Sequence, residues 1–363
     1  MITLDLRHAI ARVITDMGLG RGTGATDPGL RPGGRPGEYA SSVAFALARG
    51  IAAPARGGSR TPFEIAGGLA ASLTRRYDWI AEAKATGQGY LTLTVTPETM
   101  TSLAGRVAAA GQDCARSDAL AGQVFPAPDA ASWESAGTWN EARDRLAAHL
   151  TTRLAVAAGA KIRAATVAGE SRGASGHAAR DTVQGGPRGE KGRGTGDRSG
   201  ERGTEVAAAV AFAGADAVLF SLASAMPGRE VSIDPRMAAR HHQGNPAYAV
   251  RYAHARAASG VRWAAALGTG EAGPQRPPAN PEELTLLDAL SWLPERVAIA
   301  ARRGRPDEFA RFAQRMAELT LTAVTIPTSG RAPGSDKLTM SGAARAGLAA
   351  SLGLLGIRAP DRL

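Results

Sequence analysis

This chain of 363 residues has very little cysteine and few aromatic residues. Cys114 is the only cysteine, so no disulfide can form within the chain, which is typical of a protein from a reducing compartment. Aromatic residues make up only 5% of the chain, whereas alanine is abundant. We therefore expect a mostly aliphatic core in which helices approach one another closely.

The chain also lacks a long uninterrupted apolar run. Its first segment, MITLDLRHAIARVI, carries Asp5, Arg7 and His8 inside the apolar pattern, unlike the apolar centre of a signal peptide. No stretch approaches the ~18 apolar residues that a membrane-spanning helix needs. The sequence therefore predicts a cytoplasmic protein without a membrane partner.

Lysine is scarce, although the chain is strongly basic. The formal net charge is +10 and the sequence pI is about 10.5, which favours a polyanionic partner, nucleic acid before membrane. Of the 43 basic residues only four are lysine, and the planar fork of arginine suits phosphate groups. A GC-rich genome produces the same arginine bias, so both explanations stay open.

Signatures of several enzyme classes are missing. Neither a Gly-x-Ser-x-Gly nucleophile elbow nor a P-loop occurs in the sequence. His241 and His242 are adjacent, but no carboxylate or cysteine stands at ligand spacing from them. We expect no catalytic residue, no metal and no cofactor.

Local patterns in the first 110 residues predict a mixed α/β region. Helices are expected over residues 4–18, with Thr3 as N-cap and Gly18 as the stop signal, and over 38–49, 61–76 and 97–110. Residues 19–37 are dense in glycine and proline and predict a loop. Strands are expected over residues 79–85 and 90–95, the second with the alternation of a half-buried strand.

The remaining sequence predicts several helices and one linker. One or two helices are expected over residues 132–159, and helices near 246–267, 282–303, 306–325 and 340–354, with a bend or break before Pro294. Residues 169–204 hold 11 glycines and no aromatic residue, which predicts a disordered linker. Contact between its Arg-Gly run and RNA is an open alternative.

The segment NPAYAVRYAHAR, residues 245–256, resembles the opening of the DALR anticodon-binding domain of arginyl-tRNA synthetases, which reads close to NPVYYVQYAHAR. The later segments LSWLPERV and GLAASLGLLGIRAPDRL resemble further parts of the same domain. The segment AGADAVLFSLASAMPGREVSIDPRMA resembles the family's connection from its catalytic half. The order of these segments implies a C-terminal helical bundle that binds the anticodon side of tRNA.

Two N-terminal segments, PGEYASSVAFALAR and TGQGYLTLTV, resemble the additional domain with which the same family contacts the tRNA D-loop. The resemblance implies D-loop contacts by Gln88, Tyr90 and Thr92, with Tyr90 stacking on a base. Thr92 stands where the family has asparagine or glutamine, and a hydroxyl reads a base edge less specifically than an amide. Alternatively, Tyr90 is a half-buried aromatic residue of the strand.

On the anticodon side the resemblance and the basic charge nominate Tyr248, Arg251, Tyr252, Arg256, Arg302, Arg303 and Leu363. The two tyrosines lie four residues apart on one helical face, where they could stack on bases or pack in the core. The arginines could contact phosphates or be solvated, and a helix C-terminus favours basic charge in any case. His254 is expected to be a hydrogen-bonded structural histidine, and Trp292 a core residue.

The family's two ATP-binding signatures, His-x-Gly-His and a KMSKS-type loop, do not occur in the sequence. The predicted fold class is therefore α+β multidomain and mostly helical, with a degenerate middle region. The predicted divisions are a small N-terminal α/β domain (1–100), a helical remnant in place of the catalytic fold (101–168), the linker (169–204), a connector (205–244) and the all-α bundle (245–363).

The leading hypothesis is a non-catalytic arginyl-tRNA synthetase-like protein that binds tRNA. Arginine tRNA is the partner that the resemblance implies. One alternative is a protein-interaction subunit whose partner is a tRNA-processing enzyme or a synthetase. Another is an active arginine–tRNA ligase with an unusual active site.

Overall fold

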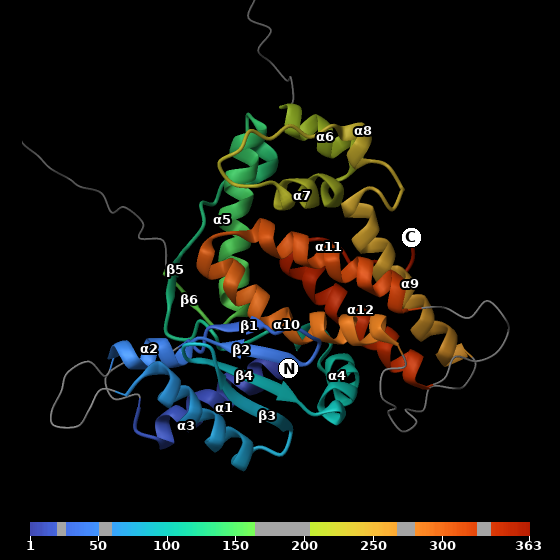
Figure 1. The fold of residues 1–363 in the computed structure, drawn as a ribbon. Helices are drawn as coiled ribbons and strands as arrows, with labels where there is room; N and C mark the ends of the chain where they lie inside the picture. Colours follow the sequence, from blue (N-terminus) through green and yellow to red (C-terminus); the bar gives the residue numbers. More distant parts are fainter. Residues whose placement is uncertain (20–26, 51–59, 164–203, 267–279, 325–334) are drawn as a thin grey trace, which may run out of the picture.

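The computed structural model describes residues 1–19, 27–50, 60–163, 204–266, 280–324 and 335–363. In Figure 1 an α/β module lies at one end of the molecule, helices α6 to α8 lie at the other end, and the bundle helices lie between them. The predicted linker lies outside the described residues except for Thr204, whose side chain accepts a hydrogen bond from Ala207 N at the start of α6.

The α/β module, as we call the described residues from 1 to 95, contains an antiparallel sheet in the order β1-β2-β4-β3. The N-terminal part comprises α1 (Ile2–Asp16), β1 (Leu30–Pro32), β2 (Glu38–Ser41) and α2 (Val43–Gly50). It continues with α3 (Pro62–Arg76), β3 (Ile80–Thr86) and β4 (Tyr90–Val95). The predicted strands at 79–85 and 90–95 and the helix at 61–76 are confirmed. A capping box between Thr61 and Glu64 fixes the start of α3.

Three predictions for this module are wrong. Strand β1 lies inside the predicted loop 19–37, and β2 occupies the start of the predicted helix 38–49, because Glu38–Ser41 pairs with residues of β4 that follow 50 to 56 positions later. Thr3 is not an N-cap: the helix begins at Ile2 and the Thr3 hydroxyl donates to the Ser291 carbonyl at 2.6 Å. Gly18 does follow the helix end, with a left-handed φ of 67°.

Two helices from the middle of the chain, residues 97–110 and 139–157, pack against helices from its C-terminal part. Helix α4 (Pro97–Ala110), capped by Thr96, leads into the short helix η1 (Gly111–Ala115). Helix α5 (Trp139–Ala157) follows the short helix η2 (Trp133–Ser135), and strands β5 (Val124–Pro126) and β6 (Lys161–Arg163) form a parallel pair beside it. Helix α5 contacts α7, α10, α11 and α12, so it belongs to the same core as the bundle.

The C-terminal part begins with α6 (Glu205–Ala213), α7 (Ala215–Ser224) and α8 (Pro235–Ala238). The bundle consists of α9 (Pro246–Ala266), α10 (Pro281–Arg303), α11 (Pro306–Ala323) and α12 (Ser335–Leu355), as predicted within a few residues at each end. Of the bend or break predicted before Pro294, the break does not occur, since α10 runs uninterrupted through this residue.

Helix α12 packs against α4, α9 and η1 at the centre of the molecule. Its stretch Leu338–Leu355 is long and apolar enough to cross a membrane, but 61% of it is buried inside the protein, as in the core helix of a globular domain. A Cβ atom on Gly347 would lie 2.4 Å from Leu290 Cδ2. Glycine at this position therefore allows α12 and α10 to approach closely.

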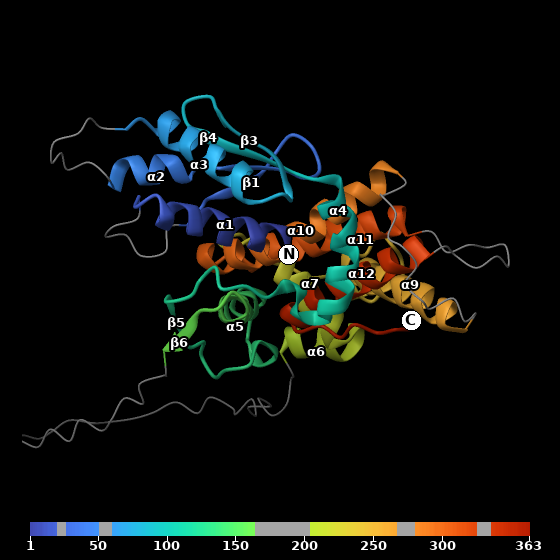
Figure 2. The same cartoon turned by 90° about the horizontal axis from the view of Figure 1, so that it is seen from below.

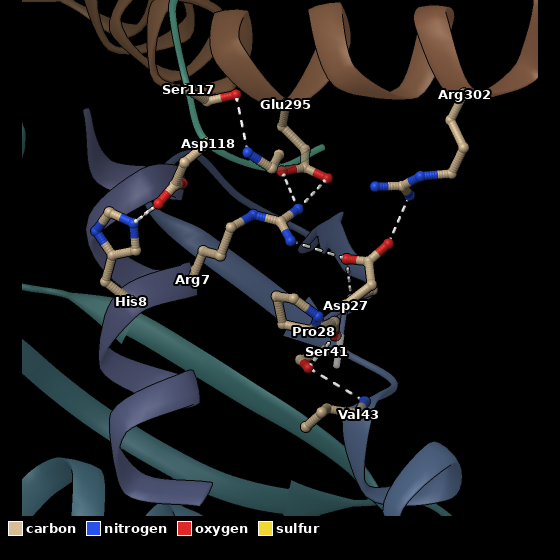
Figure 3. Close-up of polar contacts among 12 residues, drawn as sticks. Arg7, His8, Asp27, Pro28, Ser41, Val43, Ser117, Asp118, Glu295 and Arg302 are labelled. Carbon is tan, nitrogen blue, oxygen red and sulfur yellow. Dashed lines mark hydrogen bonds and ion pairs between the residues drawn. The ribbon is translucent and has the colours of Figure 1, made fainter. Parts of the chain in front are cut away.

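The α/β module docks on one stretch of α10, Asp288 to Glu295, through buried polar contacts. Arg7 on α1 donates two hydrogen bonds, of 2.9 and 2.7 Å, to the Glu295 carboxylate (Figure 3). The Glu295 side chain is only 4% exposed. The Tyr39 hydroxyl shares a hydrogen bond of 2.9 Å with Ser291 Oγ, and Gly37 N donates to Asp288 Oδ1 at 3.2 Å.

Asp27 extends this contact toward the surface. Its carboxylate binds Arg7 at 3.1 Å and Arg302, at the end of α10, at 2.5 Å (Figure 3). Burial opposes ionisation of Asp27, but the Gly29 N–H and the two guanidinium groups together lower its pKa below the ordinary value. Two acidic and two basic side chains thus alternate across the joint between the module and the bundle.

We expect Arg7→Met to reduce the free energy of unfolding by about 3 kcal/mol or more, because it leaves the Glu295 carboxylate buried without a counter-charge. Urea unfolding followed by tryptophan fluorescence measures this loss. The double variant Arg7→Met/Glu295→Leu should recover part of it. A double variant as unstable as the sum of the two single variants would contradict the proposed coupling.

Candidate nucleic-acid interface

Three aromatic rings form a stack at the start of α9. The rings of Tyr248 and Tyr252, on successive helical turns, have centroids 5.7 Å apart and planes inclined by 15°. His241, from the turn before the helix, adds a third ring at 5.5 Å and 16° from Tyr248. Both tyrosines are half-buried and His241 is exposed. The His241–Tyr248–Tyr252 stack is therefore an ordered aromatic surface that is partly open to solvent.

Asn245 holds this stack in place. Its side-chain amide donates to the carbonyls of Ala238 and Arg240 at 2.8 and 2.9 Å, and its Oδ1 accepts from Ala247 N at 3.1 Å. One side chain therefore caps the first turn of α9 and fixes the preceding turn, which carries His241. Beside it lies a hollow of about 700 Å³ between α7, α8 and α9, with Met226, Met237 and His242 in its lining.

Arg251 and Arg256 are half-buried on the same helix and contact neighbouring elements. Arg251 Nη2 lies 3.9 Å from the Asp216 carboxylate on α7, which also accepts a hydrogen bond of 2.9 Å from Arg358 Nε. Arg256 Nε donates to the Val324 carbonyl at 3.4 Å, after the end of α11. These contacts join α9 to α7 and to the chain after α11.

The remaining anticodon-side candidates lie apart from one another. Arg302 pairs with Asp27 of the α/β module, and Arg303 with Glu308 at 3.1 Å. Leu363 is 57% exposed, and Figures 1 and 2 place the C-terminus beside α9. The structure thus brings Leu363, but not Arg302, to the side of the molecule that carries α9.

His254 anchors the C-terminal tail, as expected of a structural histidine. The ring is buried, and Nδ1 donates to the Pro360 carbonyl at 2.9 Å. Arg262 Nη1 donates to the Asp361 carbonyl at 2.6 Å from the same helix. Burial lowers the pKa of His254 below 6.5, against the opposing effect of its hydrogen bond to Pro360. Trp292, 3% exposed, is the predicted core residue.

The D-loop-side candidates lie together on the β3–β4 hairpin. Tyr90 is 41% exposed and meets Phe45 edge-on, with ring centroids 5.0 Å apart. Thr92 Oγ1 shares a hydrogen bond of 2.9 Å with Thr86 Oγ1, and Gln88 is exposed in the turn. Because β4 lies between β2 and β3, Tyr90 and Thr92 project from the middle of the sheet, on the face opposite the buried Leu91 and Leu93.

Sequence reasoning missed two parts of this arrangement. His241 was considered only as a metal ligand, and its place in the stack depends on the turn fixed by Asn245, which no local pattern reveals. The network around Asp216 joins α7, α9 and the C-terminal tail, which are far apart in sequence. Among the described residues no group of three or more His, Cys, Asp and Glu side chains could hold a metal ion.

Comparison with known proteins identifies the C-terminal region. Residues 250–363 match the DALR anticodon binding domain. The C-terminal part is similar to the arginine–tRNA ligases of Frankia alni, with 31% identity over 160 residues, and Desulfitobacterium hafniense, with 34% identity over 161 residues. These matches cover 41% of this chain but only 29% and 28% of those relatives, so the matched segment spans less than a third of their length.

The fold is similar to that of Thermus thermophilus arginyl-tRNA synthetase, with a TM-score of 0.59 and 14% identity over 100% of both chains. At this identity the similarity concerns the fold alone. Together, the comparisons show that the chain is similar to arginyl-tRNA synthetases and that residues 250–363 match the DALR anticodon binding domain.

The buried neutral ring of His254 predicts a pH effect on stability. Its contribution is complete above pH 6.5 and decreases as the pH falls through the lowered pKa, because protonation then favours the unfolded chain. His254→Asn retains an N–H donor and removes the titration. We therefore expect thermal unfolding of this variant to depend less on pH below 6.5. His149→Asn on α5 is the control, and an unchanged pH profile in His254→Asn would contradict the assignment.

Proposed function

We propose that this protein binds tRNA with two surfaces, the His241–Tyr248–Tyr252 stack and the exposed face of β4, and that it does not form an aminoacyl-adenylate. The observation that carries the proposal is the ordered aromatic stack at the start of α9, where the match to the DALR anticodon binding domain begins at residue 250. Stacking on a base contributes ~1–3 kcal/mol and tolerates any base because each has a π-face.

The chemistry of the candidate residues supports two separate contact regions. Tyr248 and Tyr252, with Arg251, Arg256 and Leu363 nearby, form the proposed anticodon side. Gln88, Tyr90 and Thr92 form the proposed D-loop side. Arg302 and Arg303 engage carboxylates within the protein, so their contact with phosphate would require these pairs to open. We also propose the divisions 1–100, 101–168, 169–204, 205–244 and 245–363.

The absence of adenylate formation rests on the sequence. Amino-acid activation needs positioned donors around a pentavalent phosphate, and neither ATP-binding signature of class I synthetases occurs in the 363 residues. The chain is still basic overall, with a net charge of +10. A basic protein without this phosphate-binding chemistry is suited to hold tRNA rather than to charge it.

A second candidate is a protein-interaction subunit, and one observation favours it. Phe212, Met226 and Met237 are exposed at 64%, 40% and 51% on α6 to α8 and the loop between them. Met226 and Met237 line the same hollow, and large exposed apolar side chains that lie near one another mark many protein interfaces. A tRNA-processing enzyme or a synthetase that docks here would be the corresponding partner.

We expect Tyr248→Ala to weaken tRNA binding about 5- to 100-fold, since it removes the central ring of the stack. Fluorescence anisotropy with labelled total tRNA at several salt concentrations measures this change, and affinity should fall steeply with salt. Phe212→Ala, an exposed aromatic residue outside the stack, is the matched control.

Sequencing of the RNA that copurifies with the protein identifies the tRNA. Enrichment of arginine tRNA would support a tRNA specificity like that of the arginine–tRNA ligases the chain resembles. Failure to bind any tRNA at moderate salt would overturn the proposal. A protein partner retained after nuclease treatment, without RNA, would favour the interaction subunit instead.

ATP–pyrophosphate exchange in the presence of arginine tests the second half of the proposal. We expect no exchange above the background without enzyme, while an active arginine–tRNA ligase assayed in parallel gives a clear signal. Robust exchange that depends on arginine would show that this chain activates the amino acid.

A further inference from the structure

A hollow of about 490 Å³ lies between the α/β module and α4, outside both proposed surfaces. We call it the Trp79 groove, and its lining includes His8, Arg12, Tyr77, Trp79, Ser102 and Arg106. These residues come from α1, from the turn between α3 and β3, and from α4. The volume falls in the range of small-ligand sites, and the lining combines two aromatic rings with guanidinium groups.

Backbone hydrogen bonds hold the main chain of both aromatic residues in place. Tyr77 N donates to the Leu73 carbonyl at the end of α3, and the Trp79 carbonyl accepts from Thr96 N at the start of α4, both at 3.0 Å. The ring centroids are 5.7 Å apart, with planes inclined by 56°. Both side chains are half-buried. In the part of the chain described here, neither the Tyr77 hydroxyl nor the Trp79 indole N–H has a hydrogen-bond partner.

The charges around the groove favour an anion. Asp5 also lines it, but this carboxylate pairs with Arg106 at 2.7 Å. His8 is bound to Asp118 at 2.9 Å (Figure 3). Arg12 is exposed and makes no ion pair or hydrogen bond with any described residue. The groove therefore keeps one guanidinium group free for a phosphate beside two rings that can contact a base.

A second hollow of about 440 Å³ continues along α1 and the end of α3. Consecutive residues line the two hollows: Arg12 and Val13 on α1, and Arg76 and Tyr77 at the C-terminal end of α3. Arg76 lies 5.9 Å from the centroid of the Tyr77 ring and pairs with Asp16, which leaves Arg75 without a described partner. A track with repeated unpaired arginines suits a polynucleotide strand better than a single free nucleotide.

We propose that the Trp79 groove binds one nucleotide of a single-stranded RNA segment, with its base against Trp79 and Tyr77 and its phosphate on Arg12. This inference rests on the proposed function, because the RNA is the bound tRNA. It adds a third contact, which uses helix and turn residues of the module rather than β4. The adjoining hollow, with Arg75, receives the next phosphate along the strand.

The test compares groove variants in the full-length chain. We expect Trp79→Ala to weaken the binding of labelled total tRNA, and of an oligouridylate of ten nucleotides, roughly 5- to 150-fold. Trp79→Phe should retain most of the affinity, because it keeps a stacking ring. Arg12→Gln should reduce the slope of log affinity against log salt by about 0.7, the value for one phosphate contact of a single strand.

The matched control for charge is Arg49→Gln, which removes an exposed arginine of the same module at the end of α2, outside the groove. Its tRNA affinity should fall less than that of Arg12→Gln, and circular dichroism establishes that each variant is folded. Equal losses for the two arginine variants, or wild-type affinity in Trp79→Ala, would overturn the groove proposal.

Two further outcomes separate this inference from its alternatives. If wild-type protein binds tRNA and Tyr248→Ala weakens binding, but the groove variants do not, then the groove proposal alone fails. If wild-type protein binds no RNA, the proposed function fails with it.

Uridine monophosphate should not compete with the oligouridylate at similar concentration. Binding of the mononucleotide as tightly as the oligomer would overturn the assignment to an RNA strand.

Discussion

The buried ion pair between Arg7 and Glu295 determines how the two ends of the chain are held together. Neither charge has enough water around it to be stable alone, so each requires the other. Arg7 projects from a helix whose neighbouring residues, Leu6 and Ile10, are fully buried in the core. The same helix therefore builds the core of the α/β module and presents the cation that joins it to α10.

All the proposed RNA contacts depend on this joint. The stack on α9, the exposed face of β4 and the Trp79 groove belong to segments separated by up to about 240 residues, from Arg12 to Tyr252. They keep a fixed arrangement only if the module does not turn on the bundle. Ser291 strengthens the joint, because its carbonyl and its hydroxyl both bind the module. About two turns of α10, Asp288 to Glu295, thus position the surfaces relative to one another.

Elements with strong local signals were predicted from the sequence, and elements that depend on distant partners were not. Thr61 and Thr96 each cap a helix with proline at its first position, which marks α3 and α4 without knowledge of the fold. Strand β2 has only four residues and exists because it pairs with β4. Likewise, the spacing of Tyr248 and Tyr252 predicted a shared face, whereas the partner of Arg302, Asp27, lies 275 residues away.

The burial of the Arg7–Glu295 pair has a practical consequence for handling the protein. Mobile ions screen exposed charges within about 10 Å at 0.1 M salt, but they screen a buried pair much less. Contacts to phosphate on the surface weaken as salt rises, while the joint between module and bundle remains closed. A wash with concentrated salt should therefore remove RNA from the proposed contact surfaces and leave their native arrangement intact, so that the protein can be combined with a single defined RNA.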